Sequence, residues 1–265
     1  MLEIYSVFRK DTLKVHQQKG YILHCTAYSE SSLLVNAFTR EFGRLSLIAK
    51  GAKRKKSTSK GLLLPFKPVY LSWSGKGQLP TLTGIEQSIY LPELGGASLY
   101  CGYYINELIL KLLHRHDPHE SLFDHYDQAN RSLINCDSPN QVLRAFEKIL
   151  LKETGFGLVL DHDADTGEMI DINKVYRYFP EVGPIAIKPV NGHETDHKYG
   201  LIVHGNTLLS IDRGEFSSAQ VQSESQKLFR ALINIQLNGK ELRTRRVMRE
   251  LNRYMSKGVV KGAGQ

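Results

Sequence analysis

The side chains best suited to binding chemistry form a short cationic stretch, "AKGAKRKKSTSKG", at residues 49–61. Its cations are Lys50, Lys53, Arg54, Lys55, Lys56 and Lys60, and it contains no Asp or Glu. Lys and Arg neutralise phosphates, and the hydroxyls of Ser57, Thr58 and Ser59 can donate further hydrogen bonds to them. The pattern predicts a phosphate-binding loop. A solvated linker and a localisation signal are the alternatives that it leaves open.

A second group of cations lies near the end of the chain. Arg246, Arg249 and Arg253 are spaced so that they share one face of a helix, which we expect over Thr244–Met255. The apolar residues of another face are Val247, Leu251 and Tyr254. The cationic face is either a second phosphate-binding surface or an ordinary solvated face, favoured by cations near a helix C-terminus.

Catalytic motifs are absent from the sequence. The cationic stretch lacks the G-x-x-x-x-G-K-[ST] spacing of a nucleotide-binding P-loop, and no nucleophile elbow or H-E-x-x-H motif is present. Asp161, Asp163 and Asp165 alternate, but a calcium loop needs Gly and Glu where Thr166 and Ile172 stand. We therefore expect neither an enzyme nor a bound metal or cofactor.

Charge is divided unevenly along the 265 residues, whose net charge is +8. Residues 1–85 carry 14 Lys and Arg against 4 acids, residues 86–235 carry 13 against 21, and residues 236–265 carry 8 against 2. A basic terminal module predicts a polyanionic partner, because neutralised phosphates release counterions. Charge that serves only solubility is the alternative.

Composition and cysteine usage predict the compartment. Hydrophobic residues make up 41% and charged residues 23%, as in ordinary globular proteins. No apolar run is long enough to span a membrane, and the first residues do not resemble a secretory signal. The three cysteines (Cys25, Cys101 and Cys136) are too few and too dispersed for a disulfide framework. We expect a cytoplasmic protein with no membrane partner.

The elements that must position the cationic stretch are short strands. Residues 20–90 contain five β-rich segments, including Leu33–Thr39 and Arg44–Ala49, with Gly-rich turns between them. Five strands in this length predict a small closed sheet, either an OB-type or an SH3-like barrel. The aromatic residues after the stretch are Phe66, Tyr70 and Trp73, which either stack on bases or fill the core.

Helices follow the barrel. "LYCGYYINELILKLLHRH" has apolar residues at the helical period, and "SPNQVLRAFEKILLKETG" has boundary signals at both ends. Ser138 and Gln141 have the spacing of a capping box, and Gly155 is a typical stop. Leu228, Leu232 and Ile235 are spaced to share a face of a helix over 218–237. The fold class is therefore α+β, with a five-stranded barrel, a mainly helical domain and a small mixed α/β part.

Four segments in order resemble the RecO family of bacterial recombination mediators. They are "YSESSLLVNAFTREFGRLSLIAKGAKRKKS", "LYCGYYINELILKLL", "LRAFEKILLKETGFG" and "LNGKELRTRRVMREL". The resemblance covers nearly the whole chain and implies an N-terminal OB fold. It also implies a cytoplasmic, nucleoid-associated DNA repair protein that binds single- and double-stranded DNA and anneals complementary strands. The implied partners are RecR, the recombinase RecA and the acidic tail of the single-stranded-DNA-binding protein SSB.

The resemblance also assigns residues. The cationic stretch becomes a mobile DNA-binding loop, and we add Arg44 and Lys76 of the same module to the predicted DNA contacts. Arg144, with Phe146 and Lys148, becomes the predicted site for the SSB tail, although a surface helix charge is the alternative for Arg144. A generic OB-fold module that binds single-stranded DNA or RNA without mediator activity is the alternative function.

The expected domain boundaries follow from these segments. They are an N-terminal extension at 1–19, the OB fold at 20–90, a helical domain at 91–157, a mixed region at 158–216, C-terminal helices packed on the helical domain at 217–256 and a flexible tail at 257–265. Some members of the family carry a four-cysteine zinc site in the mixed region. This chain has no cysteine there, so we expect no zinc.

Overall fold

The computed structural model describes residues 14–55, 57, 59–187 and 200–261, with the backbone alone at 252 and 254–261. The described chain divides into two compact units. The first contains the residues up to Gly102 together with Asn106–Ile134, and the second contains Tyr103–Ile105 together with the residues from Asn135 onward. We describe each unit separately.

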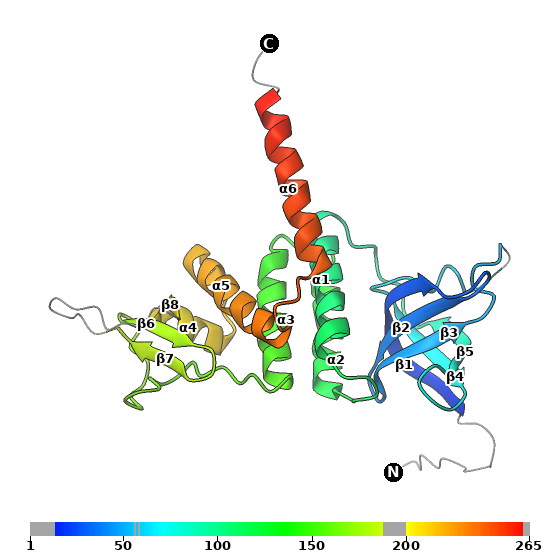
Figure 1. Cartoon of the computed structure of the whole chain (residues 1–265), viewed down its shortest axis with the longest axis horizontal. Coiled ribbons are helices and arrows are strands. Elements are labelled where there is room, and N and C mark those ends of the chain that lie inside the picture. The colour runs from blue at the N-terminus through cyan, green and yellow to red at the C-terminus, as the bar shows by residue number, and fades with distance from the viewer. Residues whose placement is uncertain (1–13, 56, 58, 188–199, 262–265) are drawn as a thin grey trace. The chain divides into compact units, whose positions relative to one another are not determined.

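The first unit is built on a closed five-stranded barrel, whose strands are labelled in Figure 1. The strands are β1 (Lys14–Ala27), β2 (Leu33–Thr39), β3 (Gly43–Ala49), β4 (Pro68–Ser74) and β5 (Thr81–Gln87). Their order around the barrel is β1-β2-β3-β5-β4, and the parallel pairing of β3 with β5 closes it. The predicted five-stranded barrel is confirmed.

The alternation of the strands explains the barrel core. Val35 and Ala37 of β2 and Leu45 and Leu47 of β3 are fully or almost fully buried. The turn between these strands needs glycine at position 43, where φ is +62° and a Cβ would lie 2.0 Å from the carbonyl oxygen of Asp117. Position 43 therefore needs glycine both for its positive φ and because a side chain would collide with the backbone of Asp117.

The first strand begins earlier than we expected. β1 starts at Lys14 rather than Gly20, and Lys14 and Val15 pair with Ser74 and Trp73 of β4. Residues 14–19 are thus part of the barrel and not of an extension. The early part of the strand was hard to recognise because its register shifts between Val15 and Gln18, which interrupts the alternation of buried and exposed residues. Residues 1–13 lie outside the described chain.

Two helices, α1 (Gly96–Leu112) and α2 (Glu120–Ser132), follow the barrel. The sequence analysis predicted α1 but missed α2, although Leu122, Phe123 and Tyr126 recur at the helical period. All three are fully buried. The rings of Phe123 and Tyr126 contact those of Tyr21 and Phe38, with centroids 5.0–6.0 Å apart. These aromatic contacts hold α2 against β1 and β2.

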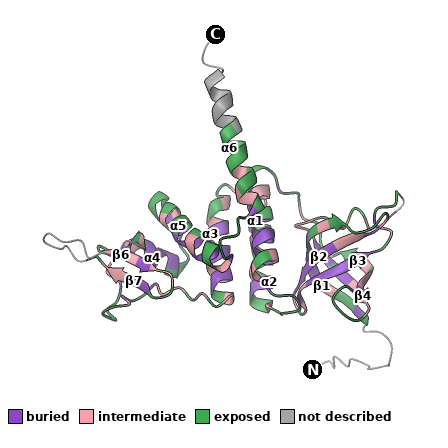
Figure 2. Ribbon diagram, viewed as in Figure 1, coloured by how far each residue is buried: buried purple, intermediate pink, exposed green. Residues whose placement is uncertain are grey.

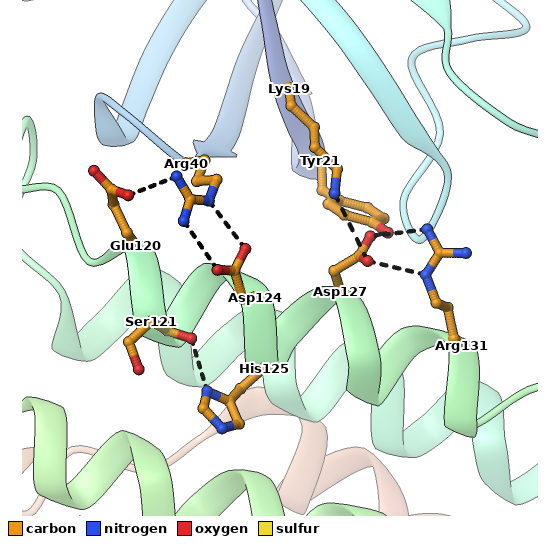
Figure 3. Close-up of polar contacts among 9 residues, drawn as sticks. All are labelled: Lys19, Tyr21, Arg40, Glu120, Ser121, Asp124, His125, Asp127 and Arg131. Carbon is orange, nitrogen blue, oxygen red and sulfur yellow. Dashed lines mark hydrogen bonds and ion pairs between the residues drawn. The ribbon is translucent and has the colours of Figure 1, made fainter. Parts of the chain in front are cut away.

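Ion pairs also form between α2 and the barrel and within α2, as Figure 3 shows. Arg40 pairs with Glu120 and Asp124, and Arg131 pairs with Asp127 within α2. The hydroxyl of Tyr21 donates a hydrogen bond to Asp127. Acidic residues of α2 thus neutralise cations of the barrel on this side, which leaves the cationic stretch as a separate feature.

The second unit contains helix α3 (Pro139–Glu153), a three-stranded sheet and three further helices. The sheet has the order β7-β6-β8, with β6 (Val175–Phe179), β7 (Gly183–Ala186) and β8 (Leu201–His204). The helices are α4 (Gly205–Arg213), α5 (Ala219–Gln236) and α6 (Arg243–Lys261). Tyr176 and Tyr178 of β6 are buried, and α5 packs against both α3 and α4.

Three details of the second unit differ from the expectations. Ser138 occupies the N-cap of α3, but its side chain makes no capping hydrogen bond, so the predicted capping box is wrong. Ile235 is 41% exposed, whereas Leu228 and Leu232 are buried. Val247 and Leu251 of α6 are also exposed, and Figure 2 shows the described part of this helix mainly as exposed. In the part of α6 whose side chains are described, Val247 and Leu251 therefore do not form a buried apolar face, and the side chain of Tyr254 lies outside that part.

Candidate nucleic-acid interface

The basic loop, which we define as residues 50–60, connects the end of β3 to the segment before β4. Its exposed cations are Lys50, Lys53, Arg54, Lys55 and Lys60, while Lys56 lies outside the described residues. Between Glu41 and Glu86 the sequence contains no acid at all. The loop therefore carries cations without a neighbouring carboxylate in the sequence, and this arrangement favours contact with phosphates.

The first residues of the basic loop contact the barrel. Ala52 and Leu63 are buried in the barrel core. The backbone nitrogen of Lys53 donates to the carbonyl oxygen of Ser31 at 3.0 Å, and its Nζ donates to that of Ser29 at 3.0 Å. These contacts join the start of the loop to the β1–β2 connection, and the mobility that we expected of the loop stays a prediction.

An exposed aromatic side chain lies in that same connection. Tyr28 is 51% exposed, and its backbone nitrogen donates to the carbonyl oxygen of Ser32. The sequence analysis considered Phe66, Tyr70 and Trp73 instead, of which Trp73 is buried and Tyr70 is 39% exposed. The exposure of Tyr28 could have been expected from the polar residues that follow it, Ser29 to Ser32. Exposed aromatic rings and cations are the two kinds of group that proteins binding single-stranded nucleic acids combine.

Arg44 and Lys76 differ from the loop cations. The Nε of Arg44 donates to the carbonyl oxygen of Leu113 at 3.1 Å, and burial together with the nearby Arg115 lowers the pKa of its guanidinium. Arg44 therefore connects β3 to the segment after α1. Lys76 is exposed in the β4–β5 loop, away from the basic loop in the sequence. Of these two residues, Lys76 is exposed whereas Arg44 is partly buried.

The cations of α6 belong to the second unit. Arg246, Arg249 and Arg253 are exposed, as the helical spacing predicted, and Arg249 pairs with Glu241. Arg245, which the sequence analysis did not single out, donates hydrogen bonds to Asn234 and to the hydroxyl of Tyr104. Its guanidinium also lies 5.4 Å from the centroid of the Tyr104 ring. Arg245 thus fixes the start of α6, while the predicted phosphate-binding face extends beyond it.

The residues predicted for the SSB tail are mostly inaccessible. Arg144 is 6% exposed and its Nη1 lies 2.8 Å from Oε2 of Glu147, which is fully buried. Phe146 is also buried. Lys148 is partly exposed, and its Nζ donates to the carbonyl oxygen of Asp212 at 2.6 Å. Arg144 is therefore neither a surface charge nor an open binding group.

Glu147 is the centre of a buried polar network. The hydroxyl of Tyr104 donates to its Oε1 at 2.8 Å and accepts a hydrogen bond from Arg245 at 2.7 Å. Burial raises the pKa of Glu147, and the neighbouring Arg144 and the Tyr104 hydroxyl offset only part of that rise. The network joins α1, α3 and the start of α6 within the second unit.

Two family models together match most of the chain. The model for the N-terminal part of recombination protein O matches residues 13–89, and the model for its C-terminal part matches residues 95–246. The first match begins next to Lys14, in agreement with the start of β1. Among the helices that the structure describes, none combines the length and the apolar character needed to cross a membrane. The described side chains include no cluster of His, Cys, Asp or Glu that could hold a metal ion.

Individual relatives agree with the two family models. The chain is 42% identical to DNA repair protein RecO of Dechloromonas aromatica over 244 residues, which cover 90% of this chain and 97% of the relative. It is 40% identical to DNA repair protein RecO of Nitrosococcus oceani over 241 residues, which cover 91% of this chain and 96% of the relative.

Proposed function

Because the chain belongs to the RecO family of DNA repair and recombination proteins, we propose that it is a mediator that binds single- and double-stranded DNA and anneals complementary strands. It does so on strands coated by SSB, and together with RecR it promotes the loading of RecA on coated gaps. The observation that carries the DNA-binding part of this proposal is the basic loop, which presents cations on a barrel segment that contains no acid.

The geometry of the loop supports annealing in physical terms. Two strands can pair only if the repulsion between their phosphates is reduced while their base edges remain accessible. Lysine side chains suit both requirements, since their long stems reach phosphates from several directions and their ammonium groups act as point charges. Binding of this kind is nearly independent of sequence and weakens steeply as salt rises.

An annealing assay tests the proposal. Complementary oligonucleotides, each coated with SSB, are mixed without metal or nucleotide, and duplex formation is followed with and without the protein. We expect acceleration by the wild-type protein. A protein that only binds single strands would bind the oligonucleotides without accelerating their pairing, and an RNA-binding module would prefer RNA in a competition experiment.

The SSB tail is the partner for which the structure changes the assignment. Since Arg144 is buried against Glu147, we propose that Lys148 contacts the acidic tail and that Arg144 positions α3. A titration with tail peptide tests the contact that we assign to Lys148. Lys148→Ala is expected to weaken binding several-fold, because a charge-assisted contact is lost. Lys152→Ala, at an exposed position on the same helix, is the matched control. Equal affinities for both variants would reject this contact.

The cations of α6 are proposed as a second DNA surface. Arg246 and Arg253 are exposed on a helix whose apolar residues Val247 and Leu251 are also exposed. The affinity of the double variant Arg246→Ala/Arg253→Ala for double-stranded DNA tests this second surface. An affinity equal to that of the wild type would leave the barrel as the proposed DNA surface.

A further inference from the structure

The barrel contains a pocket that none of the functions above uses. Its volume is about 310 Å³, and it lies between the β2–β3 turn, the start of β3 and the β4–β5 loop. Phe42, Leu45 and Trp73 line it. The rings of Phe42 and Trp73 meet edge to face, with centroids 5.2 Å apart and an interplanar angle of 85°. The inner wall is thus aromatic and rigid, because Trp73 is almost fully buried in the barrel core.

The remaining wall of the pocket offers a lysine, an imidazole and no carboxylate. Lys76 and His116 line it, and Lys76 is exposed. Lys76 stands between Gly75 and Gly77, whose φ angles of +126° and +92° favour glycine. The backbone of the β4–β5 loop is thus shaped to bring a lysine beside an aromatic pocket.

His116 is held at the pocket by contacts with β3. Its backbone nitrogen donates to the carbonyl oxygen of Arg44 at 2.9 Å, and the Nε of Arg44 donates to the carbonyl oxygen of Leu113 at 3.1 Å. Its φ is +58°, a conformation that is unusual for a residue other than glycine and that the surrounding structure must impose. Arg44 thus positions His116, and its contact with DNA stays a prediction.

We propose that this pocket receives one unstacked base of single-stranded DNA, with its ring against Phe42 and Trp73 and its phosphate near Lys76 and His116. The inference rests on the proposed DNA binding and adds a base-binding site to it. A nucleotide is the ligand that combines a flat aromatic ring with an adjacent negative charge, and both wall types of the pocket match it. A partner protein would match both walls only with an aromatic side chain beside an acidic group, and such a peptide is therefore one arm of the test.

The pocket and the basic loop can act on one strand. β3 begins at Gly43 beside the pocket and ends at Ala49, directly before Lys50. Seven residues of extended chain therefore connect the two sites along the barrel. A strand held by the loop through its phosphates and by the pocket through one base keeps its other bases accessible for pairing.

The test uses Trp73, the only tryptophan of the chain. Its fluorescence, excited where tyrosine does not absorb, is titrated with an oligothymidylate that carries a distant dye. The anisotropy of the dye reports overall DNA binding in the same samples. We expect the emission of Trp73 to change over the concentration range in which anisotropy rises. An oligonucleotide of abasic sites should raise the anisotropy and leave the emission unchanged.

Two variants sharpen the result. His116→Gly suits the positive φ and so preserves the backbone, and Lys76→Ala removes the cation from an exposed loop. Because a base seated in the pocket brings its own phosphate to Lys76 and His116, each variant should weaken binding of oligothymidylate by about fivefold. An abasic oligonucleotide leaves the pocket empty, so each variant should have little effect on its binding. Lys111→Ala, which removes an exposed cation from α1, is the control and should weaken both ligands equally or not at all.

The outcomes separate the pocket from DNA binding as such. If anisotropy rises while the emission of Trp73 stays constant, the pocket does not receive a base and the proposed DNA binding stands. If neither changes, DNA binding itself fails. If an acidic peptide with a terminal aromatic residue changes the emission and the oligonucleotide does not, the pocket belongs to a protein partner and the proposal is overturned.

Discussion

The basic loop and helix α3 present the same kind of side chain in opposite environments. The loop cations, such as Lys50 and Lys55, are exposed, and no acid occurs near them in the sequence. Arg144 of α3 is buried and lies 2.8 Å from Glu147. Both regions carry cations within motifs of the family. The loop cations are accessible to a ligand, whereas Arg144 is not.

This difference follows from the energy of charge burial. A buried guanidinium needs a carboxylate and hydrogen bonds to offset its desolvation, and once they are present it no longer serves as an open binding group. An exposed lysine has no such need, and its ammonium group can exchange water for phosphate. Removing Arg144 should therefore affect folding, whereas removing loop cations should affect DNA binding.

The largest effect is expected for Arg144→Ala. The substitution leaves Glu147 buried without its cation, and breaking a buried pair in this way costs about 3–5 kcal/mol. Urea unfolding of the purified protein measures the loss. The double variant Arg144→Leu/Glu147→Leu removes both charges and should recover most of it. If Arg144→Ala unfolds like the wild type but binds the SSB tail weakly, the original assignment of Arg144 is correct.

The same variant has a predicted pH dependence. Because the pKa of Glu147 is raised in the folded state, the native protein binds more protons than the unfolded chain between the two pKa values. The contribution of Glu147 to stability is fully present below its pKa in the unfolded chain. It is lost as pH rises through its raised pKa in the folded protein. Without Arg144 the folded pKa rises further, so the deficit of Arg144→Ala should shrink as pH falls. Unfolding at several pH values checks this sign.

A smaller effect is expected for Tyr104→Phe. The change removes the hydroxyl that donates to Glu147 at 2.8 Å and accepts from Arg245 at 2.7 Å. An oxygen left without its donor in a buried site costs about 2 kcal/mol. Urea unfolding again measures the loss, and Tyr103→Phe, at an exposed position in the same helix, is the matched control. Equal stabilities for both variants would contradict a buried network around Glu147.

The contrast also explains which parts of the molecule could be predicted from the sequence. Period-two strands and the Gly43 turn depend on local residues, so the closed barrel was recognised. Helix α2 was missed although its apolar period is present in the sequence, whereas its contacts with Arg40 and Tyr21 join residues that are distant in the sequence. The burial of Arg144 could not be predicted, since it depends on contacts from other elements rather than on the motif around it.

The residues of the candidate sites also differ in whether local sequence or tertiary contacts reveal them. The loop cations were predictable because exposure of a lysine-rich segment needs no tertiary information. The polar residues after Tyr28 also indicate exposure, but the pocket at Trp73 could not be predicted, because it forms where Phe42, Trp73 and His116 meet. A sequence pattern indicates which cations occur, whereas the folded chain decides which of them remain exposed.

Substitutions in the basic loop should weaken DNA binding and have little effect on stability, which is the reverse of what we expect for Arg144→Ala. Replacing Lys53, Arg54, Lys55 and Lys56 by Ala should weaken single-stranded DNA binding about tenfold or more at moderate salt, and each lost phosphate contact should reduce the salt slope by about 0.7. Stability should change by about 0.5 kcal/mol or less per residue. The control replaces three lysines and an arginine at exposed positions of the second unit, namely Lys152, Lys174, Lys227 and Arg230. Equal DNA affinities for the two quadruple variants would show that the loop is not the DNA site.

The smallest effect is expected for Arg131→Ala, which supplies the exposed counterpart of Arg144. Arg131 pairs with Asp127 one helical turn away at 2.9 Å, but 41% of its side chain is exposed. Burial alone would raise the pKa of Asp127, yet the hydrogen bonds from Arg131 and Tyr21 outweigh it and hold the pKa below its usual value. This pairing stabilises the fold above the unfolded pKa of Asp127 and is lost as pH falls through the folded one.

Because water and salt screen the Arg131–Asp127 pair, its removal should cost about 0.5 kcal/mol, and less in concentrated salt. The loss in Arg144→Ala should persist at the same salt concentration, since Glu147 is shielded from solvent. Urea unfolding of both variants at two salt concentrations compares them directly. A salt-insensitive loss for Arg131→Ala as large as that for Arg144→Ala would mean that burial does not decide the role of these arginines, because both pairs have nearly the same length.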